Sequence, residues 1–193
     1  MRPALMAAAV LAFAAAFHPA AAEPALADLV PMFHEDALVL SARLVDGLGP
    51  DLLDGIEAGI ETTIEYRAQI CRRRAGVPDD TIVRRRIECV VRRDALARQY
   101  LLTRRIDGEL VERRATADSR EMIDFLTRLT AVPVARRDEI PGDGEGLYLR
   151  ARCDLGLTWR FYLIPWPLGT GWVKAPFPAA PAHAGDAPRE PGL

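Results

Sequence analysis

The sequence predicts an α+β protein built on a twisted antiparallel sheet of about six or seven strands with two packed helices. Residues 60–70 and 147–155 alternate apolar and polar side chains, the pattern of a strand with one buried face. Turn signals at 75–80 and at Asp107-Gly108 separate further extended segments. Because the two clearest apolar patterns, at 60–70 and 147–155, have the period of a strand, we expect strands to dominate the core.

The first 22 residues resemble a secretory signal. A basic start at Arg2 precedes an apolar run, and Ala20-Ala21-Ala22 suits signal peptidase. The alternative is an uncleaved membrane anchor, but a span needs about 20 apolar residues and His18-Pro19 interrupts this run. No cysteine lies near the cleavage position, so a lipoprotein is not expected. We therefore expect a periplasmic or secreted protein without a transmembrane span after cleavage.

The remaining chain divides into three parts. Residues 23–36 form a leader with at most a brief helix at 26–33, and residues 37–174 form the single α+β domain. Residues 175–193 are rich in Pro, Ala and Gly, and we expect a disordered tail because such a segment cannot bury enough apolar area.

Within the domain the elements follow in order. We expect strands at 37–46, 59–74, 81–93, 97–105, 110–114 and 147–155. Acidic residues open a short helix at 51–59, and Thr116 is the expected cap of a helix that runs to Leu129. Residues 131–135 contain Pro133 and read as an edge strand or a connection, before a loop at 136–146.

The three cysteines differ in the face of the strand on which they lie. Cys71 falls on the polar face of its strand, whereas Cys89 and Cys153 fall on apolar faces, so a Cys71–Cys89 bridge is disfavoured. Cys89 and Cys153 could form a disulfide if their strands are neighbours. The favoured alternative is that both are buried free thiols that pack as small apolar side chains.

The residue inventory excludes most catalytic arrangements. After signal cleavage the only histidines are His34 and His183, the only lysine is Lys174, and asparagine is absent. A serine or cysteine nucleophile normally needs a positioned base, and none is available in the domain. No metal-ligand spacing and no phosphate-binding glycine motif occurs, so we expect neither a metal nor another cofactor.

Carboxylates provide the remaining enzymatic possibility. Glu61, Glu65 and Glu88 fall on the polar face of the hairpin, and two carboxylates that flank a sugar bond could hydrolyse an envelope glycan. The favoured interpretation is that they are cross-strand ion partners of the arginines.

The arginine-rich segments are the feature of the sequence that indicates a binding surface. The sequence predicts that two triplets lie near each other at the turn end of the hairpin: Arg72, Arg73 and Arg74 with Arg84, Arg85 and Arg86. Further arginines follow at 92, 93, 98, 104 and 105. Guanidinium groups suit phosphate and carboxylate, so this surface is a candidate contact for an anionic lipid or an acidic envelope protein. The alternative is that the arginines only solvate exposed strand faces. Nucleic acid is not an expected partner, given export and a net charge of −2.

An aromatic segment closes the domain. Trp159, Trp166 and Trp172 lie within 158–177 beside Pro165 and Pro167. We expect these rings either to pack over the sheet or to form a surface that contacts a partner protein or membrane.

Three stretches carry a family resemblance: 40–44, 53–60 and 93–102, the last containing Arg98-Gln99-Tyr100. From about Val39 to Trp172 the chain resembles the proteobacterial envelope proteins catalogued as domain of unknown function 4390. The resemblance implies an exported envelope protein and supplies no catalytic residues.

These observations together favour a non-enzymatic binding or interaction module of the cell envelope, with the arginine-rich hairpin as its contact surface. Two alternatives stay open. One is a carboxylate-based hydrolase of envelope glycan, and the other is a structural accessory subunit that docks through the C-terminal aromatic segment.

Overall fold

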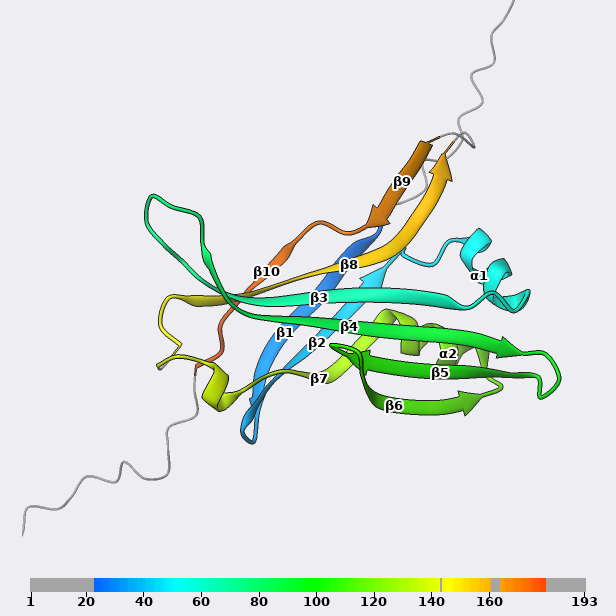
Figure 1. The fold of residues 1–193 in the computed structure, drawn as a ribbon, viewed down its shortest axis with the longest axis horizontal. Coiled ribbons are helices and arrows are strands. Elements are labelled where there is room, and N and C mark those ends of the chain that lie inside the picture. Colours follow the sequence, from blue (N-terminus) through cyan, green and yellow to red (C-terminus); the bar gives the residue numbers. More distant parts are fainter. Residues whose placement is uncertain (1–22, 143, 161–163, 180–193) are drawn as a thin grey trace, which may run out of the picture.

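Two antiparallel sheets pack face to face in the computed structural model, with strands that cross obliquely (Figure 1). The structure describes residues 23–142, 144–160 and 164–179. The expected signal sequence at 1–22 and most of the expected tail, 180–193, lie outside the described residues. The predicted class, antiparallel α+β with two helices, is confirmed, although the sequence did not predict a second sheet.

The large sheet has seven strands, six of them in the order β10-β8-β3-β4-β5-β6, while β9 pairs with β8. Its strands are β3 (Thr62–Arg72), β4 (Asp80–Asp94), β5 (Gln99–Ile106), β6 (Glu109–Thr116), β8 (Leu147–Arg160), β9 (Ile164–Gly169) and β10 (Val173–Pro176). Strands β3 to β6 form a meander of consecutive hairpins. The alternation of apolar side chains and the turn at Asp107-Gly108 predict these pairings correctly.

The small sheet has the order β1-β2-β7, with strands β1 (Ala25–His34), β2 (Ala37–Val45) and β7 (Arg128–Arg136). The prediction of a leader helix at 26–33 is wrong, because this segment is the edge strand β1. Leu29 and Phe33 pack against the core, whereas Val30 and Met32 are exposed, which is the period of a strand. Pro31 is compatible with this position because an edge strand leaves one side of its backbone unpaired.

Two helices connect the two sheets: α1 (Pro50–Glu57) links β2 to β3, and α2 (Ser119–Thr127) links β6 to β7. The cap of α2 is Asp118, whose side chain accepts a hydrogen bond of 2.8 Å from the backbone N–H of Arg120. The predicted cap, Thr116, lies just before it and donates instead to Glu121. Neither helix in the described part of the chain has the length and hydrophobicity needed to cross a membrane.

The core lies between the sheets. One face of the large sheet contributes Ile64, Tyr66 and Leu149, and α2 adds Phe125 and Leu126. No helix or strand among the described residues packs on the opposite face, which we call the open face (Figure 1). Since side chains alternate along each strand, the polar residues of β3, β4, β5 and β8 gather on this open face.

The chain stays ordered beyond the point at which the sequence predicts a disordered tail. Ala175 pairs with Leu149 in β10 and is buried. The ring of Phe177 packs edge-on against Phe33 of β1, with 6.0 Å between centroids. The 3-10 helix η1 (Arg137–Glu139) begins the loop that leads from β7 to β8.

Cys89 and Cys153 are free and buried, as the favoured interpretation predicts, and Cys71 is also free and buried, although the sequence places it on the polar face of its strand. Burial raises the pKa of the Cys89 thiol and of the Cys153 thiol above the usual value. Cys71 lies on the open face, where its sulfur is 3.8 Å from the hydroxyl of Thr81.

Candidate functional site

The two arginine triplets do not lie side by side. Arg72 is opposite Asp80, near the tip of the β3–β4 hairpin, whereas Arg84 is opposite Gln69. Three residues of a strand separate these positions, or about 10 Å. The first triplet is therefore at the tip, and the second is on the body of the sheet.

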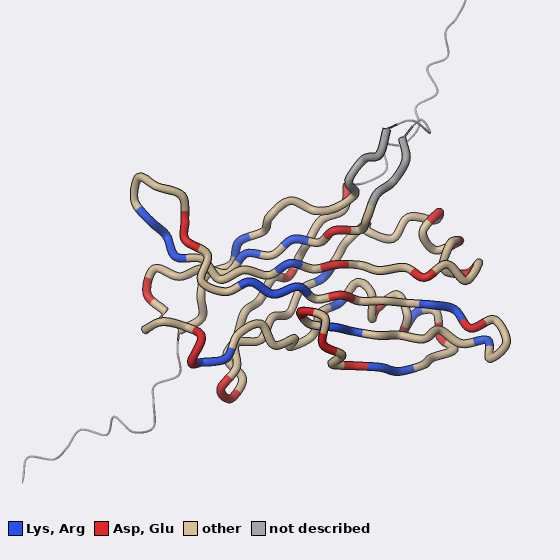
Figure 2. The backbone as a smooth tube through the Cα atoms, in the orientation of Figure 1, with Lys and Arg blue, Asp and Glu red and all other residues tan. Residues whose placement is uncertain are grey.

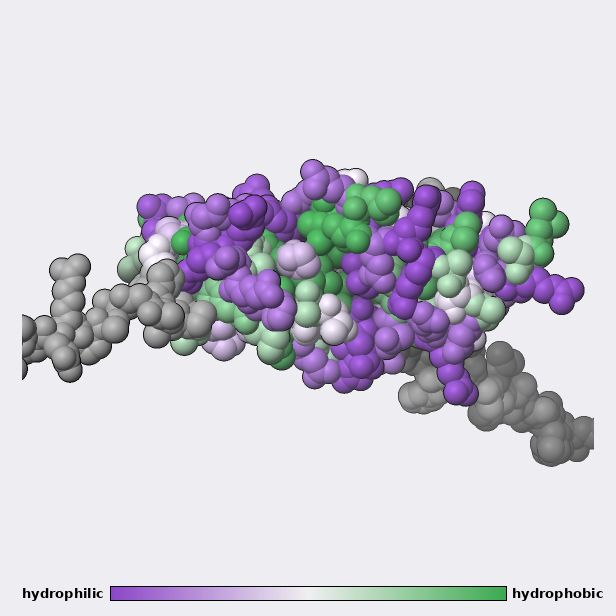
Figure 3. Space-filling model, turned by 90° about the horizontal axis from the view of Figure 1, so that it is seen from below, coloured by the Kyte–Doolittle hydropathy of each residue, from purple (hydrophilic) through white to green (hydrophobic). Residues whose placement is uncertain are grey.

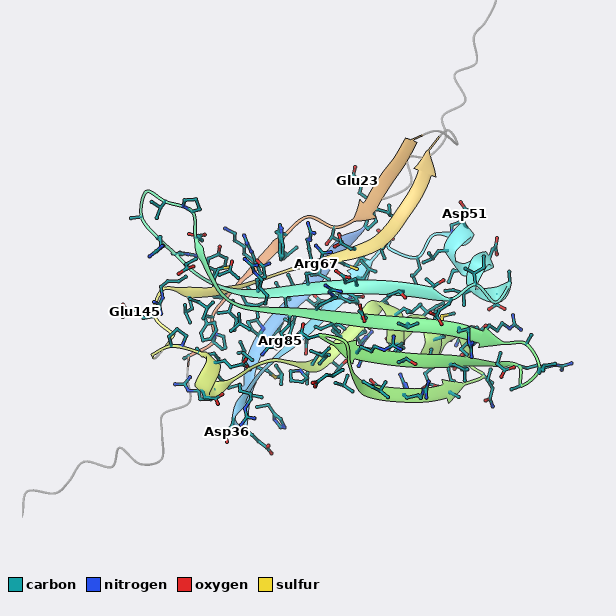
Figure 4. The ribbon with its side chains drawn as sticks, viewed as in Figure 1. Glu23, Asp36, Asp51, Arg67, Arg85 and Glu145 are labelled. Atoms are coloured by element: carbon teal, nitrogen blue, oxygen red, sulfur yellow. The ribbon has the colours of Figure 1, made fainter. Side chains whose placement is uncertain are left out.

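The second triplet is divided between two faces. Because side chains alternate along β4, Arg84 and Arg86 point to the open face, whereas Arg85 points to the other side, toward β7 and η1. Figure 4 labels Arg85 on the side of β4 that faces β7. The Arg85 guanidinium forms ion pairs with Glu139 at 2.5 Å and with Asp107 at 3.6 Å. Arg85 thus joins the large sheet to the segment that follows β7, and is not available to an external ligand.

Glu65 and Glu88 lie directly opposite each other in the register of β3 and β4. Glu65 pairs with Arg67 at 2.5 Å and with Arg86 at 3.8 Å, and Glu88 pairs with Arg86 at 3.8 Å. Arg67 also reaches Asp154 of β8 at 3.3 Å. The Glu65–Arg86 pair is a cross-strand ion pair of the kind that the favoured interpretation predicts, whereas Glu65–Arg67 and Glu88–Arg86 each lie within one strand. Figure 2 shows the resulting mixture of basic and acidic positions along neighbouring strands.

A groove of about 630 Å³ crosses the open face beyond these ion pairs. Its lining residues come from β4, β5 and β6 and from the segment before β3: Glu61, Val90, Arg92, Leu101, Thr103, Arg105, Arg113, Arg114 and Ala115. Small and apolar side chains form its floor, and charged side chains surround it. The third predicted acid, Glu61, is therefore part of this groove.

The register explains why these residues meet. Val90 is opposite Thr103, which is opposite Arg113, and this forms one row across three strands. Arg92, Leu101 and Ala115 form a second row in the same way. Adjacent rows on one face are two residues apart, or about 7 Å along the strand.

The arginines of the groove differ in their partners. Arg114 pairs with Glu112 at 3.3 Å and with Glu121 at 2.6 Å. Among the described residues, Arg92, Arg105 and Arg113 have no carboxylate within ion-pair distance. Arg105 is opposite Glu88 in the register, yet the salt-bridge partner of Glu88 is Arg86. The groove therefore holds positive charge that the described protein does not neutralise.

At the hairpin tip, Tyr148 of β8 provides an anchor. Its hydroxyl donates a 2.6 Å hydrogen bond to Asp79, and the cations of Arg73 and Lys174 lie 5.8 Å and 4.8 Å from the centre of its ring. Burial and the bond to Asp79 raise the pKa of Tyr148 to about 12. The same bond lowers the pKa of the Asp79 carboxyl. Arg72, Arg73 and Arg74 are all exposed around this anchor.

Of the three predicted tryptophans, only the side chain of Trp172 is described. It is half-buried, and the guanidinium groups of Arg150 and Arg152 lie 4.7 Å and 5.1 Å from its ring centre. Trp159 and Trp166 belong to the paired strands β8 and β9, and their side chains lie outside the described residues. Trp172 is thus a packing partner for two arginines of the open face.

The described ranges hold no group of three or more His, Cys, Asp or Glu side chains that could bind a metal ion.

The family model described as "Domain of unknown function (DUF4390)" matches residues 21–158. The chain belongs to this family. The DUF4390 match includes the whole β3–β4 hairpin and every residue of the groove, and it ends before Trp159 and Trp172. It confirms the family that the Arg98-Gln99-Tyr100 strand indicates, and that strand is β5 with the turn before it. Comparisons with the curated proteins and with the solved structures gave no match.

From the sequence, Arg92 and Arg105 are identified only as further arginines, and Arg113 is not identified as a candidate site residue. The alternation of side chains along three segments could have indicated the groove. Every second residue lines it: residues 90 and 92 in the first segment, 101, 103 and 105 in the second, and 113 and 115 in the third. It carries this meaning only once the pairing of β4, β5 and β6 is known.

Proposed function

We propose that this protein is an exported, non-enzymatic binding module of the cell envelope that contacts an anionic partner through the open face of its large sheet. One observation carries the proposal. Four arginines on that face have no carboxylate partner among the described residues: Arg84, Arg92, Arg105 and Arg113. The signal-like segment at 1–22 supports the proposal that the protein is exported.

The chemistry favours an anionic partner for a physical reason. An arginine that already holds a carboxylate, such as Arg67, gains little from a second anion. An arginine without such a partner contributes its full set of donors to a phosphate or carboxylate. The exposed tip with Arg72 to Arg74 extends this basic surface beyond the body of the sheet.

The test is a double charge reversal, Arg73→Glu with Arg84→Glu, combined with in vivo crosslinking from the open face. Arg84 is a better probe than Arg85, because Arg85→Glu would break the ion pairs with Glu139 and Asp107. We expect the double variant to fold and to lose the captured partner.

The control is Arg120→Glu, which makes one such charge reversal at an exposed position of α2, on the covered side of the sheet, and is compared with each single variant as well as with the double variant. It should leave capture unchanged. Equal capture by the double variant and the unmodified protein would refute the binding surface.

A further inference from the structure

We infer that the groove across β4, β5 and β6, together with the β4–β5 turn beside it, binds the phosphate headgroup of an anionic phospholipid at a membrane surface. This inference rests on the proposed function and adds the class of ligand. The groove combines uncompensated arginines with an apolar floor, and the turn adds an exposed leucine.

The charge of the groove selects an anion. Arg92, Arg105 and Arg113 lack carboxylate partners among the described residues, and Glu61 is the one acid in the lining. Three guanidinium groups around one hollow can share the oxygens of a phosphate through several hydrogen bonds.

The floor of the groove selects an anion that also has an apolar part. Val90 and Thr103 are almost fully buried at its base, and Leu101 lies beside them in the second row. A free inorganic phosphate would leave this surface without a complement. A lipid headgroup with its glycerol and upper acyl carbons covers both the arginines and the floor.

Leu96 is the observation that favours a membrane over a soluble anion. It lies at the tip of the β4–β5 turn and is 99% exposed. The carboxylate of Asp94 accepts hydrogen bonds of 3.0 Å from the backbone N–H groups of Leu96 and Ala97, so the turn is held in one shape. A fixed turn that presents a leucine to solvent is a means of inserting an apolar side chain among lipids.

The turn and the groove are next to each other. Arg93 pairs with Tyr100 in the register and Arg92 with Leu101, so the second row of the groove is two positions from the pair that closes the turn, Asp94 and Gln99. When Leu96 inserts into the membrane–water interface, Arg92 and the other residues of the second row of the groove lie at the depth of the lipid headgroups. Arg98, also in the turn, is exposed at the same end.

A partner peptide fits this site less well. Strand addition would place a peptide along the unpaired edge of β6, whereas the groove runs across three strands, over residues from β4 to β6. A peptide bound at that edge would not cover Val90 or Arg92.

The experiment is cosedimentation of the purified protein with vesicles. We expect binding to vesicles of mixed phosphatidylcholine and phosphatidylglycerol, weaker binding at high salt, and no binding to phosphatidylcholine alone. Arg105→Gln and Arg113→Gln should each weaken binding about fivefold. Leu96→Ser should weaken binding to the anionic vesicles, and the binding that remains should be more sensitive to salt.

The control is Arg120→Gln, which removes the charge of an exposed arginine of α2 on the covered side of the sheet and should change binding less than twofold. Three results would overturn the inference: no binding to the anionic vesicles, an equal loss with Arg120→Gln, or equally tight binding of inorganic phosphate or polyglutamate that the Arg105 and Arg113 variants lose. If crosslinking at Arg73 and Arg84 captures a partner while vesicles do not bind, only the lipid inference fails.

Discussion

Arg85 of β4 and Glu139 of η1 form an ion pair across the two sheets, with 2.5 Å between Nη2 and Oε1. Glu139 also accepts a 2.7 Å hydrogen bond from the backbone N–H of Arg136, at the end of β7. One carboxylate therefore joins the small sheet to the large one at this end of the sandwich.

Replacing this carboxylate should lower stability in a manner that depends on pH. The hydrogen bond from Arg136 and the ion pair with Arg85 lower the pKa of Glu139, so the unfolded chain binds a proton more readily than the folded protein. The stabilisation is present above the ordinary pKa of about 4.3 and is lost as pH falls through the lower folded value. We expect Glu139→Gln to cost about 0.5–1 kcal/mol at neutral pH.

Urea unfolding at several pH values checks this prediction. The difference between the variant and the unmodified protein should shrink as pH falls below about 4.3. A difference that is independent of pH would contradict it. Asp138→Asn, which changes a neighbouring and more exposed carboxylate, is the control.

Tyr66→Phe should destabilise the contact between β3 and the end of α2. The Tyr66 hydroxyl donates a 2.6 Å hydrogen bond to the carbonyl oxygen of Leu126, and both groups are buried. Phenylalanine keeps the packing but leaves that carbonyl without its donor, so we expect a loss of about 1–3 kcal/mol in unfolding free energy. Denaturant titration measures it. A change below the error of extrapolation would show that another donor replaces the hydroxyl.

The thiols should not react in the folded protein. Cys71, Cys89 and Cys153 are all buried, and burial raises the pKa of Cys89 and of Cys153, which lowers the thiolate fraction. We expect no labelling by an alkylating reagent under native conditions and three equivalents after unfolding. Labelling of one thiol in the native protein would identify a part of the sandwich that opens.

Phe33 and Phe177 should contribute jointly to stability. Their edge-on contact joins β1 to the residues after β10, so Phe177→Ala should cost about 1–2 kcal/mol, with Phe33→Ala in the same range. The double variant should lose less than the sum, because the two changes remove one shared contact. Additive losses would mean that the rings stabilise the protein independently.

The sequence predicts the elements better than it predicts their surfaces. Alternation along 60–70 and 147–155 identifies β3 and β8, and the Asp107-Gly108 turn identifies the β5–β6 hairpin. The segments of β2 and β7 are predicted as extended at 37–46 and 131–135, but β1 escapes prediction because it contains Pro31 and does not alternate apolar and polar side chains strictly.

The residues of the candidate site are also difficult to predict from the sequence, because their meeting depends on strand pairing. Composition reveals the arginines, but only the register shows that Arg85 points inward while Arg84 points outward. The groove depends on three strands whose residues are up to 25 positions apart, such as Val90 and Ala115, and no local pattern contains that pairing.

The strand order has a consequence for how the protein folds. Strands β3 to β6 are joined by short turns, whereas β8 reaches β3 only after a long excursion, as in the pair Tyr66 and Cys153. Closing so long a loop costs more entropy than closing a hairpin, so we expect the meander to gain protection in pulsed hydrogen exchange before β8 does. Simultaneous protection would contradict this order. The two rows of the groove, which come from β4, β5 and β6 alone, would then form before the core between the sheets is complete.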